Sequence, residues 1–169
     1  LLEPAVVGAR IVGPDGEEQA GARRGALSVR TAISGYLGGP GLRRDHEPMP
    51  DAAIAMETVS GAAMLMSRAG FDRLGGFDEG YFLHVEDIDL CKRARDAGGQ
   101  VVFEPRAIAH HAGQTSKVSA LKVERWKANG LIRYFARHGG APGPVKAMLL
   151  APVIYGAVYA RAIFRLVRR

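Results

Sequence analysis

Three of the four glycine pairs in the sequence each follow a segment with a helical pattern, and they divide the chain into short elements. Glycine ends a helix readily, because it takes the left-handed conformation of a C-cap without steric cost. The pairs stand at 75–76, 98–99 and 139–140. They predict a short helix after the N-cap Ser67, a second helix from about Val85 to Ala97, and a third from Ser119 to His138.

Segments rich in β-branched residues lie before and between these helices. Residues 5–12 (AVVGARIV) stop at a GPDG turn, a pattern typical of a strand. Residues 54–66 are predicted to be buried extended chain with a break at Ser60-Gly61. A strand is predicted at 101–103, ended by Pro105, and a further short one at 107–109. Strands alternating with helices predict an α/β or α+β layered domain, while residues 17–52 give no clear element.

Composition limits the class of partner. The 169 residues are 47% hydrophobic and 24% charged, typical of one globular domain, and the net charge of +6 favours anionic partners. Basic residues are not interleaved with aromatic ones, so no nucleic acid is expected. The single cysteine, Cys91, excludes an internal disulfide. Because the chain begins with Leu rather than Met and has no secretory signal, we expect a fragment or a processed chain.

The C-terminal residues 141–169 are predicted to form a basic amphipathic helix. Residues 147–160 carry no charge, but 14 residues with Pro152 among them are expected to be too short to span a bilayer. From Ala157 on, two faces separate, which favours a helix lying in a membrane interface. The alternative is a helix packed on its own domain. The basic face holds Arg161, Arg165 and Arg168, and the apolar face holds Tyr159, Ile163, Leu166 and Val167.

The densest acidic cluster, Glu86-Asp87-Ile88-Asp89, opens the second predicted helix. A helical wheel turns Glu86 and Asp87 toward the domain interior and turns Asp89 outward. Carboxylates aimed at the interior are costly unless they bind something, and a general base is one such use. The alternative is an ordinary acidic first turn that complements the helix dipole.

Two adjacent histidines, His110 and His111, follow the predicted strands. Neighbouring residues on extended chain point in opposite directions, so at most one of them joins a given site. A histidine near carboxylates is able to ligate a divalent metal, and a structural histidine is the alternative.

Taken in order, these motifs resemble the second half of family 2 glycosyltransferases, most closely the bacterial rhamnosyltransferase-like enzymes of cell-surface polysaccharide synthesis. The resemblance covers about residues 5–140. The segments that carry it are residues 60–65 (SGAAML), 75–79 (GGFDE), Tyr81-Phe82, 86–91 (EDIDLC), 102–105 (VFEP) and His110-His111.

The resemblance implies an α/β chain that forms the C-terminal portion of a GT-A fold, followed by C-terminal helices. It implies a nucleotide-sugar donor, a divalent cation (Mg²⁺ or Mn²⁺) and inversion at the anomeric carbon. By matching position, Asp87 is the catalytic base, with Glu86 as its neighbour or as an acceptor ligand. His110, with His111 as the alternative, helps to hold the metal. The implied substrate-binding residues are Gly61, Ala62, Gly76, Phe77, Asp78 and Tyr81.

One departure from the family is that its nucleotide-binding half, with the metal-binding Asp-x-Asp, has no counterpart here. We therefore expect residues 1–140 to be an acceptor-side half and the isolated chain to be inactive. The expected function is sugar transfer to a cell-surface polysaccharide or lipid-linked acceptor. The expected location is cytoplasmic, peripheral to the inner face of the plasma membrane and touching its anionic surface. The alternative is a non-catalytic basic module that binds anionic membrane or nucleic acid.

Overall fold

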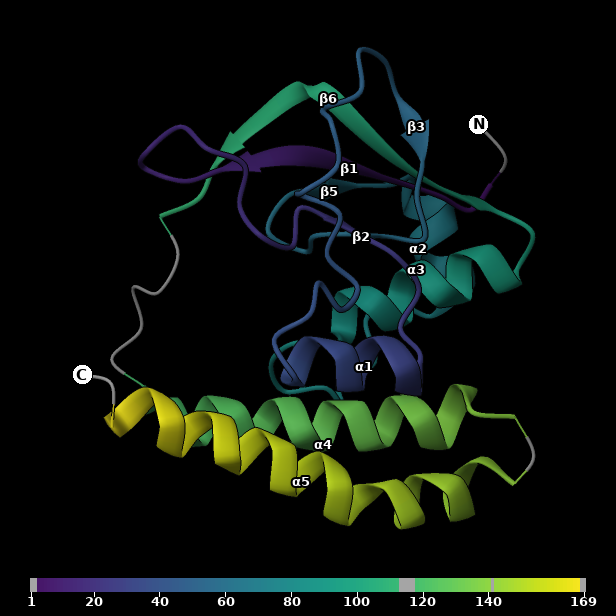
Figure 1. Cartoon of the computed structure of the whole chain (residues 1–169). Coiled ribbons are helices and arrows are strands. Elements are labelled where there is room, and N and C mark those ends of the chain that lie inside the picture. Colours follow the sequence, from purple (N-terminus) through teal and green to yellow (C-terminus); the bar gives the residue numbers. More distant parts are fainter. Residues whose placement is uncertain (1–2, 113–117, 141, 168–169) are drawn as a thin grey trace. The chain divides into compact units, whose positions relative to one another are not determined.

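A computed structural model of the protein describes residues 3–112, 118–140 and 142–167, with the backbone alone for 161–167 (Figure 1). Contacts divide the chain into two compact units. The sheet unit comprises Leu1–Phe77 and Asp87–Thr115, and the helical unit comprises Asp78–Glu86 and Ser116–Arg169. The predicted mixed α/β class is confirmed. The functional boundary expected at residue 140 stays a prediction. By its contacts, the helix that ends just before residue 140 belongs to the same unit as the C-terminal helix.

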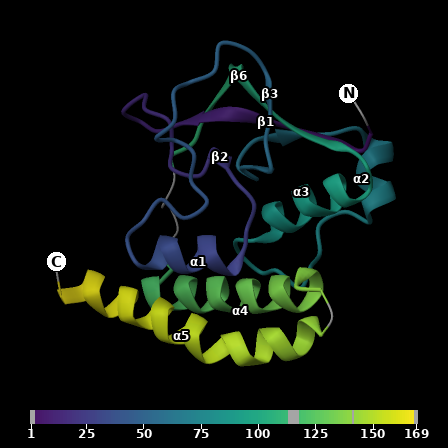
Figure 2. The same cartoon turned by 45° about the vertical axis from the view of Figure 1, so that its right-hand side comes forward.

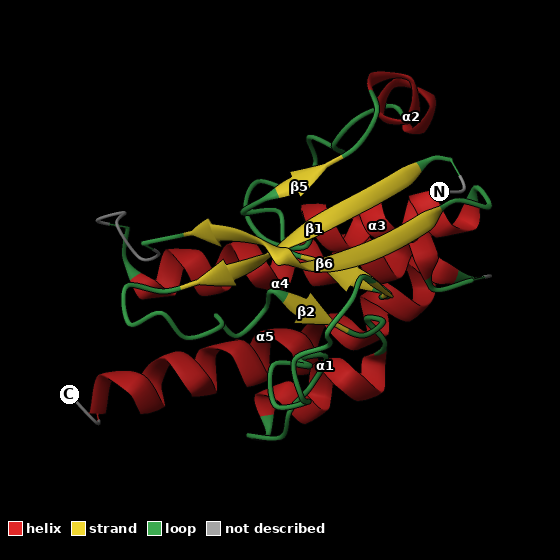
Figure 3. Cartoon of the chain, turned by 90° about the horizontal axis from the view of Figure 1, so that it is seen from above, coloured by secondary structure: helices red, strands yellow, loops and turns green. Residues whose placement is uncertain are grey.

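Two long parallel strands form the centre of the sheet unit, β1 (Ala5–Val12) and β6 (Gln100–His110). β5 (Met64–Leu65) pairs antiparallel with β1, and β3 (Ile54–Ala55) pairs antiparallel with β6. The order is therefore β3-β6-β1-β5. Figure 3 shows β1 between β5 and β6. The strand predicted at 5–12 is confirmed at both ends.

The prediction of two strands separated at Pro105 is wrong, because β6 runs through this residue. The ladder with β1 shifts register there, from the pair Ala9↔Glu104 to the pair Arg10↔Ile108. Proline has no N–H to donate, so a bulge is one of the few places in a sheet that tolerate it. The bulge absorbs the proline, and the strand continues to His110.

The region 17–52, which gave no clear element, contributes a strand and a helix. β2 (Arg23–Arg24) pairs antiparallel with β4 (Thr58–Val59) in a separate small sheet. α1 (Val29–Tyr36) begins at the N-cap Ser28, whose side chain forms a capping box with Thr31. None of the residues of α1 is buried.

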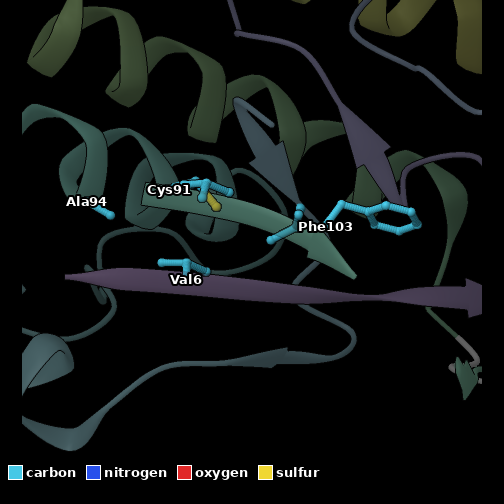
Figure 4. Packing of buried hydrophobic residues seen from close by; sticks show 6 residues of the cluster. Val6, Cys91, Ala94 and Phe103 are labelled. Carbon is cyan, nitrogen blue, oxygen red and sulfur yellow. The ribbon is translucent and has the colours of Figure 1, made fainter. Parts of the chain in front are cut away.

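Two helices complete the sheet unit. α2 (Arg68–Leu74) begins after the predicted N-cap Ser67 and ends at Gly75, which has φ +77°. α3 (Glu86–Asp96) lies within one residue of its predicted bounds. α3 packs on the sheet through Cys91 and Ala94, which meet side chains of β1 and β6 in a hydrophobic core (Figure 4). The core cluster consists of Val6, Val59, Cys91, Ala94, Val101 and Phe103.

The helical unit is built on two helices, α4 (Ala120–His138) and α5 (Gly143–Val167), which lie side by side (Figures 1 and 2). The N-cap Ser119 and the end of α4 at His138 are as predicted. α5 buries Ala147, Ile154 and Val158, so one stripe of this helix is packed.

The expectation that the tail is too short to span a bilayer is wrong. α5 begins at Gly143, before the uncharged run, and its 25 residues measure about 37 Å at 1.5 Å per residue. Its stretch Gly143–Ala160 is long and apolar enough to cross a membrane, by length and composition alone. The side chains of Arg161, Ile163, Arg165, Leu166, Val167 and Arg168 lie outside the described residues, so the predicted amphipathic face stays a prediction.

Candidate functional site

Asp87 is the second residue of α3 and is buried, with 7% of the residue exposed, which confirms its predicted inward orientation. Its Oδ2 accepts hydrogen bonds from the backbone N–H of Gly61 (2.9 Å) and from the guanidinium of Arg24. Its Oδ1 accepts one from the N–H of Ile88 at 2.8 Å. The helix N-terminus also favours a negative charge at this position. The carboxylate is thus held mainly through one of its two oxygens.

The loop after β4 approaches Asp87 closely. A Cβ added to Gly61 would lie 3.2 Å from the Cβ of Asp87, so glycine is what allows this N–H to reach the carboxylate. The next residue, Ala62, is exposed, and its N–H bonds the Ser60 hydroxyl at 3.2 Å. The structure therefore brings two predicted site residues together, Gly61 and Asp87, and places Ala62 at the adjacent surface.

Sequence reasoning missed Arg24. The residue lies in the region 17–52, where the sequence predicts no clear element, yet its side chain forms an ion pair with Asp87 and is 14% exposed. The same Nη2 donates to the carbonyl of Val59 at 3.0 Å. The sequence contains one related signal, the adjacent pair Arg23-Arg24. If the two residues lie on a strand, their side chains face opposite sides, so one of them faces inward. This signal gives no indication of which arginine meets the acid.

The prediction that Asp89 points outward is wrong. Asp89 is fully buried, at 0% exposure, and forms an ion pair of 2.7 Å with Arg93 one turn later. Arg93 in turn donates to the carbonyls of Leu74 (2.6 Å) and Gly76 (2.8 Å). The helical-wheel prediction assumes that only one side of α3 is packed, whereas the turn after α2 covers the other side as well. Asp89 therefore fastens that turn to α3.

The glycine turn that follows α2 shows where two further predicted site residues lie. Gly76 has φ +70°, a conformation that favours glycine, and its carbonyl is the one held by Arg93. Phe77 is 42% exposed and packs edge-on against Phe71, with ring centroids 5.8 Å apart. The sheet unit thus presents an aromatic ring at the end of a rigid turn.

Asp78, in the helical unit, joins its loop to α4. Its carboxylate accepts hydrogen bonds from Arg133 at 2.8 and 3.1 Å and from Arg137 at 2.6 Å. The N–H of Gly80 adds a bond of 2.9 Å. The Arg133 hydrogen bonds, assisted by the Gly80 N–H, lower the pKa of Asp78 to about 2. A carboxylate so fully engaged positions the loop, so any effect on substrate is indirect.

Aromatic residues of the same loop also pack on α4. Tyr81, a predicted substrate-binding residue, is 6% exposed, and the guanidinium of Arg133 lies 5.5 Å from its ring centroid. Phe82 is 75% exposed and contacts Trp126, with centroids 4.6 Å apart. Of the two rings in this loop, Tyr81 is buried and Phe82 is accessible.

The chain enters α3 through two residues in the left-handed region, His84 (φ 65°) and Val85 (φ 74°). This conformation is strained for a β-branched residue, and such strain persists only where the surroundings impose it. Val85 is buried, and a Cβ on Gly130 of α4 would lie 3.0 Å from its Cγ2. Glu86, the predicted neighbour of the base, is half-buried directly after this turn.

The predicted metal ligands do not form a cation site in the described chain. His110 and His111 are exposed at the end of β6, and the Nδ1 of His111 lies 2.9 Å from the Oε1 of Gln19. Among residues 3–112, 118–140 and 142–167, no group of three or more His, Cys, Asp or Glu side chains could hold a metal ion. The two histidines alone do not complete a cation site among the described residues, and their role as metal ligands stays a prediction.

Chemically, the sheet unit offers a buried, hydrogen-bonded carboxylate at the start of a helix, next to a glycine-containing loop. Residues 45–167 match the protein family described as Glycosyl transferase family 21. Because the match spans most of the chain, the protein belongs to this family of glycosyltransferases.

Two curated relatives are rhamnosyltransferases. Rhamnosyltransferase WbbL of Escherichia coli (strain K12) is 37% identical over 94 residues, which are 53% of this chain and 36% of that protein. An N-acetylglucosaminyl-diphospho-decaprenol L-rhamnosyltransferase of Mycobacterium tuberculosis is 31% identical over 143 residues, 79% of this chain and 46% of that protein. The chain thus spans less than half the length of either relative. The predicted rhamnosyltransferase-like resemblance is confirmed.

Proposed function

We propose that the chain is the acceptor-side part of an inverting glycosyltransferase with a GT-A fold. It would transfer a deoxyhexose such as rhamnose from a nucleotide-sugar to a hydroxyl of a lipid-linked saccharide. The observation that carries the proposal is the buried carboxylate of Asp87, held at Oδ2 by Gly61 and Arg24. The names of the two relatives support the sugar and acceptor classes. The alternative of a non-catalytic basic module is not favoured by these relatives.

In the proposed reaction Asp87 acts as general base. Its Oδ1 accepts one hydrogen bond among those described, from Ile88, and a carboxylate oxygen carries two lone pairs. The acceptor hydroxyl donates its proton to this oxygen while the hydroxyl oxygen attacks the anomeric carbon. The bond between that carbon and the nucleoside diphosphate breaks, and the diphosphate leaves with the electron pair. A single displacement of this kind inverts the configuration at the anomeric carbon.

The remaining predicted residues are assigned supporting roles. Gly61 and Ala62 border the Asp87 carboxylate. Gly76 and Phe77 lie in the turn after α2, which Arg93 holds through the carbonyl of Gly76. Asp78 and Tyr81 act through α4 by fixing their loop. A divalent cation, if the reaction uses one, needs ligands beyond those that the described residues bring together.

The decisive experiment replaces Asp87 by asparagine in the native protein that carries this chain. Turnover should fall by about 10²- to 10⁴-fold, the usual contribution of a general base, with donor affinity unchanged. Asp96→Asn is the matched control, because Asp96 lies on the same helix and is 52% exposed. NMR of the product should show inverted anomeric configuration. Wild-type turnover in Asp87→Asn, or retained configuration, would refute the proposal.

We also propose that α5 holds the protein at the cytoplasmic face of a membrane. Its exposed side includes Val145, Met148, Leu149 and Val153, which are 46% to 68% exposed. Buried apolar area in an interface adds affinity that salt does not remove. Replacing Met148 and Leu149 by glutamine should weaken co-sedimentation with anionic vesicles. The control Leu37→Gln, an 82% exposed leucine of the sheet unit, should not. Equal binding by all three proteins would exclude α5 as the contact.

A further inference from the structure

Two consecutive arginines of β2 make entirely different contacts. Arg23 and Arg24 point to opposite sides of the strand, as extended backbone requires. Arg23 is 2% exposed and is bound through every nitrogen of its guanidinium. Its partners are the carboxylate of Glu18, the carbonyls of Glu47 and Pro48, and the ring of Phe103. Arg23 is explained by the stability of the fold.

Arg24 is not explained in the same way. Its Nη2 donates to Asp87 Oδ2 and to the carbonyl of Val59, while its Nε is buried without a hydrogen-bond partner among the described residues. Leaving a buried donor unsatisfied costs about 1–3 kcal/mol. The cost is consistent with a side chain placed to meet one particular carboxylate.

The contacts of Asp87 show what Arg24 does to it. Arg24 and the Gly61 N–H both bind Oδ2, so this oxygen has no capacity left for a substrate hydroxyl. Oδ1 is left with a lone pair beyond the bond from Ile88.

We propose that Arg24 is a positioning residue for the general base, an inference that rests on the proposed function. Arg24 occupies Oδ2 together with the Gly61 N–H, so that Oδ1 alone receives the proton of the acceptor hydroxyl. After the transfer Oδ2 becomes the carbonyl oxygen of the neutral acid and still accepts from Arg24 and Gly61. The carboxyl group therefore stays in place through the catalytic cycle.

The test is a double-mutant cycle in the native protein. Arg24→Ala should lower kcat on the order of 10²-fold, the usual penalty for a misplaced catalytic group, and leave KM for the donor unchanged. In the Asp87→Asn background the same replacement should cost little more, because its effect passes through Asp87. Arg30→Ala, an exposed arginine of α1, is the matched control and should keep wild-type kcat.

Chemical rescue separates positioning from folding. Guanidinium ion at low, non-denaturing concentration should restore part of the activity of Arg24→Ala, because it fits the vacated position. Arg24→Lys should recover little, since an ammonium lacks the planar fork. Protection of the buried Cys91 thiol reports that each variant is folded.

The outcomes distinguish this inference from the proposed function. Wild-type turnover of Asp87→Asn would overturn the proposed function itself. If Asp87→Asn is impaired but Arg24→Ala is not, or if the two losses multiply, Arg24 does not act through Asp87. A rise in donor KM in Arg24→Ala would assign it to the donor instead, and would equally overturn the inference.

Discussion

Replacing Asp89 by asparagine removes one charge of a pair that is buried in the sheet unit. Asp89 is 0% exposed and Arg93 is 12% exposed, with 2.7 Å between the carboxylate and the guanidinium. The variant keeps the shape of the side chain and an oxygen that accepts a hydrogen bond. It leaves the buried cation of Arg93 without its counter-ion.

The magnitude follows from burial. Breaking a buried ion pair by removing one partner costs about 3–5 kcal/mol. Arg93 keeps its bonds to the carbonyls of Leu74 and Gly76, so the lower end, about 3 kcal/mol, is expected here. The pair Lys92–Asp96 has the same i,i+4 spacing on the same helix but is 29% and 52% exposed. Its loss in Asp96→Asn should cost no more than about 0.5 kcal/mol.

Urea unfolding followed by circular dichroism measures both variants. With a dependence of about 1–3 kcal/mol per molar urea, Asp89→Asn should lower the midpoint by at least about 1 M. Asp96→Asn should lower it by no more than about 0.5 M on the same scale. Equal shifts in the two variants would refute the assignment of Asp89 as a buried structural residue. The result also matters for activity assays, because Asp89→Asn is not a neutral control for Asp87→Asn.

Three further outcomes are expected. Burial raises the pKa of the Cys91 thiol to about 11. Ellman's reagent at pH 8 should therefore label no thiol in the folded chain and one thiol after denaturation. Labelling of the native chain would contradict the core packing. Gly8→Ala should destabilise the chain by about 1–3 kcal/mol, because its Cβ would lie 2.3 Å from that of Val59. Gly156→Ala, with no atom within 4 Å, is the control and should not destabilise it. Because the pKa of Asp78 is lowered, its contribution to stability is present above about pH 4 and is lost as the pH falls toward 2. The midpoints of Asp78→Asn and wild type should therefore differ at pH 7 and converge near pH 2, and a constant difference would exclude this cause.

The sequence by itself determined the local elements that carry strong signals. Serines 67 and 119 as N-caps and Gly75 as a C-cap fixed the helices α2 and α4, because capping is decided by a few neighbouring residues. The order of the motifs between Gly61 and His111 was sufficient for the family resemblance. The helical wheel alone predicted that the side chain of Asp87 faces inward, and Asp87 is buried.

Only the tertiary structure decided which charges are paired. A helical wheel considers a single helix and none of its neighbours, and for this reason it predicted that Asp89 points outward. In the structure the turn after α2 covers that side of α3, and Asp89 is buried in an ion pair with Arg93. Arg24 reaches Asp87 across 63 residues of chain, and no local pattern encodes such a contact. Pro105 was predicted to end a strand, but a register shift with β1 absorbs it. Local propensity places elements, whereas burial and ion pairing depend on segments that are distant in sequence.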